Sequence, residues 1–135
     1  ETAISEVRPH PGESACVAEF EILDSLNIVD LRNPRKLVSP FLLTDEGEVS
    51  LLREDIEFLE KLGRELTNPV HPTLASIDYI PSQYLCEFIK KCGYNGVLYN
   101  SSVSKGMNLA LFSPSNAKAI QMQSFNITKV AVEFN

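Results

Sequence analysis

The stretch that decides the fold is GYNGVLYNSSVSKGMNLALF, residues 93–112. It places a polar, serine-rich segment between two short apolar runs, residues 96–99 and 109–112. Short apolar runs bounded by glycine, asparagine and serine are typical of strands joined by a turn. Serine and asparagine also hydrogen-bond to nearby backbone groups, so the loop taken alone indicates turn chemistry rather than a binding site.

A helix is expected immediately before this stretch, over residues 81–92. Its apolar residues follow the i, i+3, i+4, i+7 spacing of one helix face: Leu85, Phe88, Ile89 and Cys92. Pro81 suits the first helical position, and Gly93 suits the position just after the last turn. The polar Gln83 lies in the first turns of this helix.

A longer helix is expected over residues 46–66. Asp45 and Glu48 have the spacing of a capping box. One apolar stripe follows at steps of three and four residues: Val49, Leu52, Ile56, Leu59, Leu62 and Leu66. The charged residues between them indicate a solvated outer face.

The N-terminal third predicts a helix and two strands. Residues 1–7 contain good helix formers, with Thr2 able to cap the turn and Pro9 stopping its continuation. Residues 15–23 alternate in polarity, which predicts a half-buried strand. Its expected inner face consists of Cys16, Ala18, Phe20 and Ile22. A second strand is expected at residues 27–31, followed by a loop over residues 32–47 that contains two prolines.

Two further strands are expected near the C-terminus, at residues 119–122 and 130–134. Helices and strands are interspersed without a regular βαβ alternation, so the pattern favours an α+β fold over a doubly wound sheet. A length of 135 residues is that of one domain.

Composition excludes several classes of protein. The chain is 44% hydrophobic but has no long apolar run, which argues for a soluble protein without a membrane partner. A net charge of −6 and the lack of a dense basic block argue against direct nucleic-acid binding. Three cysteines without a C-x-x-C pair argue against a secreted disulfide framework and favour the cytoplasm.

No familiar catalytic or metal motif appears in the sequence. The G-x-S-x-G elbow, the phosphate-binding glycine loop and the H-E-x-x-H run are all missing. His10 and His71 each lie beside prolines, without other ligands at metal-binding spacing, so we expect no metal site. His10 lies four residues from Glu6, which leaves a substrate contact open.

Three separated segments resemble the RES domain family, in the order in which that family has them. They are ETAISEV at residues 1–7, YIPSQYLCEFIKKCGYNGVLYNSS at residues 79–102 and GMNLALF at residues 106–112. The resemblance spans nearly the whole chain. Residues 32–75 are its least diagnostic part, and we expect them to form a variable insertion that contains the long helix.

The resemblance implies a set of site residues. The family glutamate corresponds to Glu6, and the family serine to Ser101, with Ser102 as the alternative one position away. Asn108 and Gln83 match an asparagine and a glutamine of the family. The family's arginine and an active-site tyrosine lie upstream of the glutamate motif. The chain also opens without methionine, so we expect the N-terminal part of the domain to precede it in a longer polypeptide.

The family resemblance also implies a fold and a function. The fold would be similar to that of ADP-ribosyltransferases, and the activity that of a toxin consuming NAD as an NAD phosphorylase or glycohydrolase. The partners would be NAD, inorganic phosphate and a cognate Xre-type antitoxin. Two alternatives stay open: transfer of ADP-ribose to a protein, and a non-catalytic binding or regulatory domain.

Each candidate residue then has an expected role. Glu6 would stabilise the oxocarbenium-like charge on ribose. Ser101 would hold the nicotinamide-ribose end or the phosphate, with Asn108 and Ser102 supporting it. A nucleophilic serine is not expected, because no motif places an activating base beside it.

Overall fold

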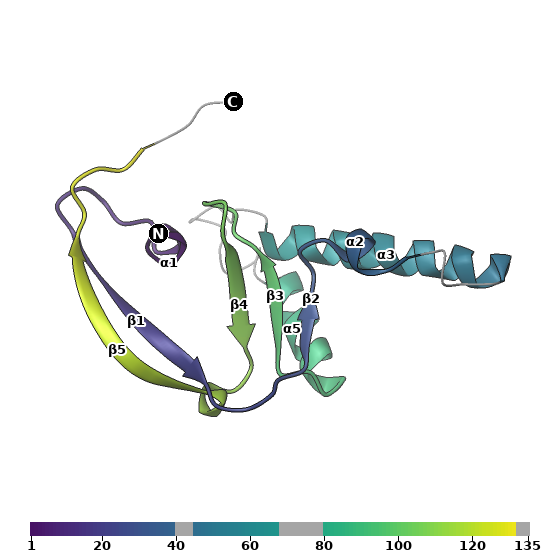
Figure 1. Ribbon diagram of the computed structural model, residues 1–135. Coiled ribbons are helices and arrows are strands. Elements are labelled where there is room, and N and C mark those ends of the chain that lie inside the picture. Colours follow the sequence, from purple (N-terminus) through teal and green to yellow (C-terminus); the bar gives the residue numbers. More distant parts are fainter. Residues whose placement is uncertain (40–44, 68–79, 132–135) are drawn as a thin grey trace.

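The structure is a computed structural model that describes residues 1–39, 45–67 and 80–131. Helices and strands are mixed within this part of the chain (Figure 1), which confirms the predicted α+β class. The helices are α1 (Thr2–Glu6), α2 (Pro34–Leu37), α3 (Glu46–Thr67), α5 (Ile80–Lys91) and the 3-10 turn η2 (Pro114–Asn116). The strands are β1 (Ser14–Ile22), β2 (Ile28–Asp30), β3 (Gly96–Asn100), β4 (Met107–Leu111) and β5 (Ala117–Asn126).

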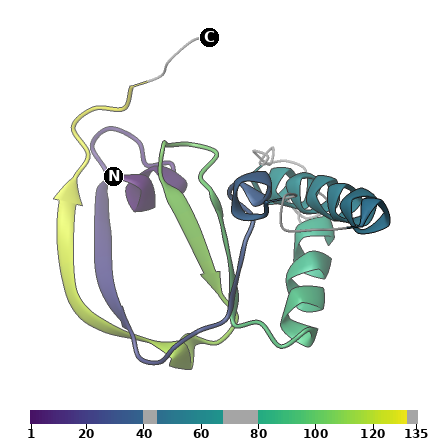
Figure 2. The same ribbon diagram turned by 45° about the vertical axis from the view of Figure 1, so that its right-hand side comes forward.

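The strands form two separate sheets. The larger sheet has the order β2-β3-β4, with β2 parallel and β4 antiparallel to β3. Strands β1 and β5 pair antiparallel from Ser14↔Asn126 to Ile22↔Ala117, with a register shift between Glu19 and Phe20. We call this pair the β1–β5 ribbon. It curves beside α1, well away from α3 and α5 (Figures 1 and 2).

The core lies between the larger sheet and the helices α3 and α5. Its buried residues are Leu31, Leu85, Ile89 and Val97. Half-buried residues of α3 pack against them, among them Leu59, Leu62 and Leu66. Helix α3 approaches β2 closely at Gly63, where a Cβ atom would stand 2.7 Å from the carbonyl oxygen of Leu31. The predicted apolar stripe of α3 therefore meets the sheet. Of the stripe predicted for α5, Leu85 and Ile89 are in the core, whereas Phe88 and Cys92 are exposed.

Both long helices agree with the sequence prediction, and their ends do as well. Asp45 accepts a hydrogen bond from the backbone N–H of Gly47 at 3.3 Å, as a helix cap does. Gly93 has a φ of 90°, the left-handed conformation that commonly ends a helix and that glycine adopts without strain. The predicted loop at residues 32–47 is wrong in one part, because α2 forms there. An Arg35–Glu60 ion pair, with 3.0 Å between Nε and Oε1, holds α2 on α3.

The predicted strands are found, with changes at their ends. Strand β4 begins two residues earlier than expected, and β5 covers ten residues where the apolar run predicted four. Pairing with β1 extends β5, because backbone ladder bonds do not need apolar side chains. Of the strand expected at residues 130–134, Val130 and Ala131 lie in no helix or strand, and the remainder falls outside the described residues.

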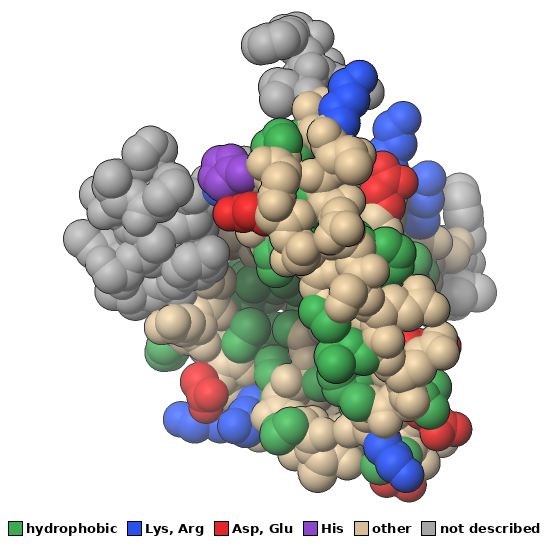
Figure 3. Space-filling model, turned by 90° about the vertical axis from the view of Figure 1, so that its left-hand side faces the viewer, with side chains coloured by type: hydrophobic (Ala, Val, Ile, Leu, Met, Phe, Trp, Pro, Cys, Tyr) green, Lys and Arg blue, Asp and Glu red, His purple; other side chains and the backbone are tan. Residues whose placement is uncertain are grey.

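The predicted inner face of β1 is wrong. Cys16, Phe20 and Ile22 are exposed, with Phe20 at 59% of its full accessibility, and only Ala18 is half-buried. Helix α1 lies against the other residues of β1, where Ala15 and Val17 are half-buried. Figure 3, which looks onto this side of the molecule, shows hydrophobic side chains gathered on the surface. The alternating polarity predicted the strand correctly, but it did not predict which face of the strand lies against α1.

Candidate active site

The site is built on the hairpin of β3 and β4. Residues 101–106, which we call the serine loop, join the two strands directly after Asn100 and before Met107, which face each other in the ladder. The Ser101 N–H continues the ladder by donating to the Gly106 carbonyl at 3.0 Å. The serine loop is therefore closed at its base, and its side chains are held close to the start of β4.

Glu6 of α1 meets this hairpin from the far end of the sequence. Its Oε1 atom accepts a hydrogen bond from the Ser101 hydroxyl at 2.7 Å and another from the Asn108 amide at 2.6 Å. The structure thus brings together three of the five residues that the sequence singled out.

The Ser101 hydroxyl makes as many hydrogen bonds as a hydroxyl group can make. It donates to Glu6 and accepts from the backbone N–H groups of Val103 at 3.2 Å and Ser104 at 3.1 Å. A hydroxyl has one proton to donate and two lone pairs to accept with, so no bonding capacity remains. Ser101 is also only 8% exposed. This geometry suits a residue that orients Glu6. It does not suit a nucleophile, because a nucleophilic hydroxyl would need a free lone pair.

Glu6 itself is exposed, and only one of its oxygens is held. No donor within the described ranges contacts Oε2, whereas Oε1 has two. The carboxylate therefore has a fixed orientation and presents one free oxygen to solvent. A fixed carboxylate of this kind can stabilise positive charge that develops on a bound molecule.

A second contact between α1 and the serine loop lies one helical turn from Glu6. The Ser104 hydroxyl donates to the Thr2 hydroxyl at 2.9 Å. The sequence predicted Thr2 as the helix cap, which is wrong, because Glu1 stands at the N-cap and no side chain caps the helix. The four-residue spacing of Thr2 and Glu6 was the available signal, since residues four apart share a helix face.

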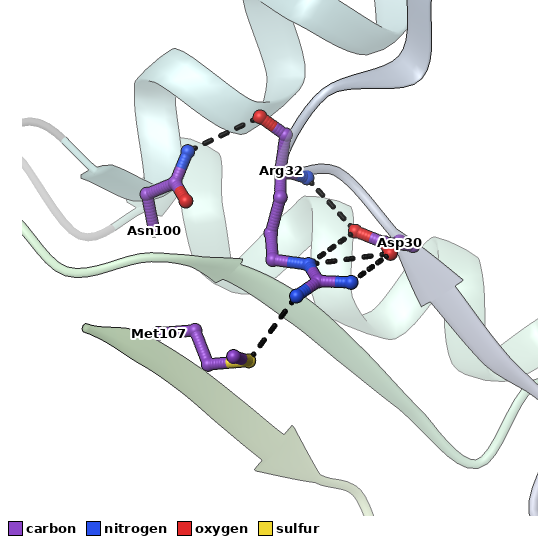
Figure 4. Close-up of polar contacts among 4 residues, drawn as sticks. All are labelled: Asp30, Arg32, Asn100 and Met107. Atoms are coloured by element: carbon purple, nitrogen blue, oxygen red, sulfur yellow. Dashed lines mark hydrogen bonds and ion pairs between the residues drawn. The ribbon is translucent and has the colours of Figure 1, made fainter. Parts of the chain in front are cut away.

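The base of the serine loop is anchored by residues that the sequence reasoning missed (Figure 4). The Asn100 amide donates to the Arg32 carbonyl at 3.1 Å. The Thr67 hydroxyl donates mainly to the Gly63 carbonyl, at 2.7 Å, and lies 3.3 Å from the Asn100 carbonyl. The Arg32 guanidinium binds the Asp30 carboxylate, with 2.7 Å between Nη2 and Oδ2, and reaches Met107 Sδ at 3.3 Å. Arg32 thereby lowers the pKa of Asp30, chiefly through these hydrogen bonds. The ends of β2 and α3 are thus fastened to β3 just before Ser101.

Two predicted site residues do not join Glu6. Gln83 is exposed on α5, and β3 and β4 stand between α5 and α1 in both ribbon views (Figures 1 and 2). Ser102 is exposed beside Ser101. Of the two adjacent serines, Ser101 is the one that contacts Glu6. The ligand-binding roles of Gln83 and Ser102 stay predictions.

Other residues that the sequence singled out have structural contacts. The backbone N–H of His10 donates to the Glu13 carboxylate at 2.8 Å, which closes a turn. Tyr99 and Phe112 pack against the core, which agrees with their expected role as core residues. His71 lies outside the described residues. Among the described residues, no group of three or more His, Cys, Asp and Glu side chains is placed to hold a metal ion.

A pocket of about 430 Å³ lies next to α1, on the side that faces β1. Its apolar wall includes Ala3, Ile4, Val7, Ala15 and Val17. Helix α1 therefore stands between this pocket and the serine loop. It presents Glu6 to the loop and its apolar residues to the pocket.

Glu6, Ser101 and Asn108 come from separate segments of the chain, and their meeting agrees with one family pattern. A family model described as the RES domain matches residues 1–129. The chain belongs to the RES domain family. This membership is consistent with a NAD-related toxin role and with NAD as the substrate. No curated protein and no solved structure matches the chain.

None of the RES domain's helices within residues 1–39, 45–67 and 80–131 combines the length and the apolar character that crossing a bilayer requires.

Proposed function

We propose that this RES domain cleaves NAD at the bond between nicotinamide and ribose, with phosphate or water as the acceptor. One observation carries the proposal: Ser101 and Asn108 hold Glu6 by a single oxygen, and no other donor in the described part of the chain binds its second oxygen. Family membership supports NAD as the substrate. The mixed arrangement of helices and sheets agrees with an ADP-ribosyltransferase-like fold, which we propose with it.

The proposed chemistry needs a fixed negative charge beside ribose. The C1′–N bond breaks with its electron pair moving to the nicotinamide nitrogen, which leaves as a neutral molecule. Ribose C1′ becomes electron-poor, as in glycoside cleavage, and a carboxylate lowers the energy of that state. An oxygen of phosphate or water then bonds to C1′, and water releases a proton to solvent.

Each residue at the site has a role in this scheme. Glu6 is the catalytic residue, with Oε2 directed at the substrate. Ser101 and Asn108 are positioning residues, because they act on the substrate through Glu6. Preorganised polar groups of this kind stabilise a transition state without reorganising during the reaction. The exposed Ser102 is proposed to contact the ligand, and inorganic phosphate is the proposed co-substrate.

The family also suggests a partner and a location. RES domains are associated with antitoxin partners, so we propose a cognate Xre-type antitoxin for this chain. Cytoplasmic location is proposed on the three cysteines, which are all free.

The test is product analysis with the full-length protein. It is incubated with NAD, with and without phosphate, and the products are identified by mass spectrometry. An ADP-ribose phosphate product indicates phosphorolysis, and free ADP-ribose indicates hydrolysis. A mass increment on a protein would replace our proposal with ADP-ribose transfer. NAD left intact would favour a non-catalytic binding or regulatory domain and refute the proposal.

A further inference from the structure

Helix α1 has few internal interactions that could fix its position. It has five residues, and none of them is buried. Such a short helix is not stable alone, because too few backbone bonds repay the cost of forming the first turn. The position of Glu6 therefore depends on what α1 contacts. The serine loop supplies two of those contacts, from Ser101 to Glu6 and from Ser104 to Thr2, and Asn108 of β4 supplies a second bond to Glu6.

The contact at Thr2 is a directed chain of hydrogen bonds. The Gly106 N–H donates to the Ser104 hydroxyl oxygen at 3.1 Å. That hydroxyl in turn donates to Thr2 Oγ1 at 2.9 Å. The backbone N–H of Ser104 also donates to Ser101 Oγ, the atom that binds Glu6. The two anchors of α1 are thus built from the same few residues of the serine loop.

Gly106 lets Thr2 come this close to the loop. A Cβ atom at position 106 would overlap Thr2 Oγ1 and stand 2.9 Å from both Thr2 Cβ and Cγ2. Real side chains do not make such contacts, so any residue larger than glycine would push Thr2 away. The need for glycine here comes from close approach, since Gly106 is not among the residues with positive φ.

We propose that Thr2, Ser104 and Gly106 form a latch that positions Glu6 for NAD cleavage, and this inference rests on the proposed function. A helix fastened only at Glu6 can still rotate about that point. A second anchor one turn away removes this freedom. Thr2 is thus a positioning residue that acts through the orientation of Glu6.

The latch is tested with Thr2→Val, Thr2→Ser and a matched control in the full-length protein. Thr2→Val keeps the shape of the side chain but removes the hydroxyl, whereas Thr2→Ser keeps the hydroxyl. The control is Ser5→Ala, because among the described residues the Ser5 hydroxyl bonds to the carbonyl of Glu1, at the N-cap of the same helix, and to no group of the serine loop. Values of kcat and KM for NAD are measured together with the melting temperature.

We expect Thr2→Val to lower kcat by about tenfold with a smaller change in KM, because a slightly misplaced catalytic group loses rate more than binding. Thr2→Ser and Ser5→Ala retain most of kcat, and melting temperatures stay close to that of the wild type. Gly106→Ala lowers kcat like Thr2→Val, and the double variant adds no further loss, since both changes break one contact. A wild-type kcat in Thr2→Val, or an equal loss in Thr2→Val and Thr2→Ser, would overturn the latch.

A measurement without NAD separates this inference from the proposed function. Amide hydrogen exchange of Ser104 and Gly106 reports whether the serine loop is held. We expect Thr2→Val to speed exchange at these amides and Ser5→Ala to leave it unchanged. If the wild type fails to cleave NAD, the proposed function is refuted while exchange still tests the latch. Equal exchange in both variants would refute the latch itself.

Discussion

At the scale of single residues, the Ser101 side chain connects the parts of the site. Removing its hydroxyl takes away the acceptor of the Val103 and Ser104 N–H groups and one of the two donors to Oε1 of Glu6. We therefore expect Ser101→Ala to lower the free energy of unfolding by about 1–3 kcal/mol. The exposed Ser102 provides the control, because Ser102→Ala should change the free energy of unfolding by less than about 0.5 kcal/mol. Urea unfolding of both variants measures the difference, and equal stabilities would contradict the described bonding.

The Asp30–Arg32 pair predicts how stability depends on pH. The Arg32 guanidinium lowers the pKa of Asp30 in the folded protein below the ordinary value of an aspartate. As the pH falls, the unfolded chain therefore takes up a proton at this residue first. The stabilising effect is complete above the unfolded pKa of about 4 and is lost as the pH falls through the lower folded pKa.

This pH dependence is measured as urea unfolding between pH 6 and pH 3. We expect the stability of the wild type to fall more steeply below about pH 4 than that of Asp30→Asn, which cannot titrate at this position. Identical slopes in the two proteins would show that the pair contributes nothing to the folded state.

The residues of the site were predictable only in part. Glu6, Ser101 and Asn108 came from family motifs, and the structure adds that they touch. The bond between Thr2 and Ser104 joins residues 102 positions apart, and no local pattern encodes such a pairing. Local spacing shows which side chains share a face, whereas the tertiary fold decides what that face meets.

At the scale of the elements, the close approach of α3 to the backbone at the end of β2 limits the size of the side chain that fits at position 63. A Cβ at Gly63 would stand 2.7 Å from the Leu31 carbonyl oxygen, which belongs to fixed backbone. Alanine normally favours a helix over glycine by about 1 kcal/mol. Here we expect Gly63→Ala to destabilise the protein by about 1–3 kcal/mol, because the helix must move away from the sheet.

The same helix supplies the control for this prediction. Among the described residues, the atoms nearest a Cβ at Gly47 belong to the Asp45 side chain, at 3.3 Å or more, and a side chain can shift by a few tenths of an ångström where fixed backbone cannot. Gly47→Ala should therefore destabilise the protein less than Gly63→Ala does. Chemical denaturation of the two variants compares them, and a stabilised Gly63→Ala protein would contradict the close packing of α3 on β2.

The elements were the most predictable level of the structure. The two long helices follow from periodic apolar residues, with ends marked by Asp45 and Gly93. The length of β5 was underestimated, because the polar residues Lys118, Gln123 and Ser124 flank the apolar run while the backbone ladder with β1 continues through them. The inner face of β1 was wrong because alternation does not say which side a neighbour covers.

At the scale of the whole molecule, large apolar side chains of several elements lie on the surface. Among the described residues, Phe20 is 59% exposed, Met122 71% and Phe58 55%. Folding gains stability from apolar area that it removes from water, and these side chains add little to that area. The apolar area that the described residues bury is correspondingly small.

The heat capacity of unfolding measures that area directly. A compact domain of this length would show an increase of about 1.6–2.0 kcal/mol/K, since each residue contributes about 12–15 cal/mol/K. We expect calorimetry on the 135-residue chain to give a smaller value. A value in the compact range would mean that the exposed apolar faces are covered in solution.

The central claim is that Glu6, held by Ser101 and Asn108, drives cleavage of NAD. Its most direct test is the rate of nicotinamide release by full-length wild type, Glu6→Gln and Glu19→Gln. Glu19 is the matched control, because its exposed carboxylate also accepts a side-chain amide, from Gln121 at 2.5 Å, but lies on β1. We expect Glu6→Gln to lose at least about 100-fold in kcat and Glu19→Gln to match the wild type. Equal rates in all three proteins would contradict the claim.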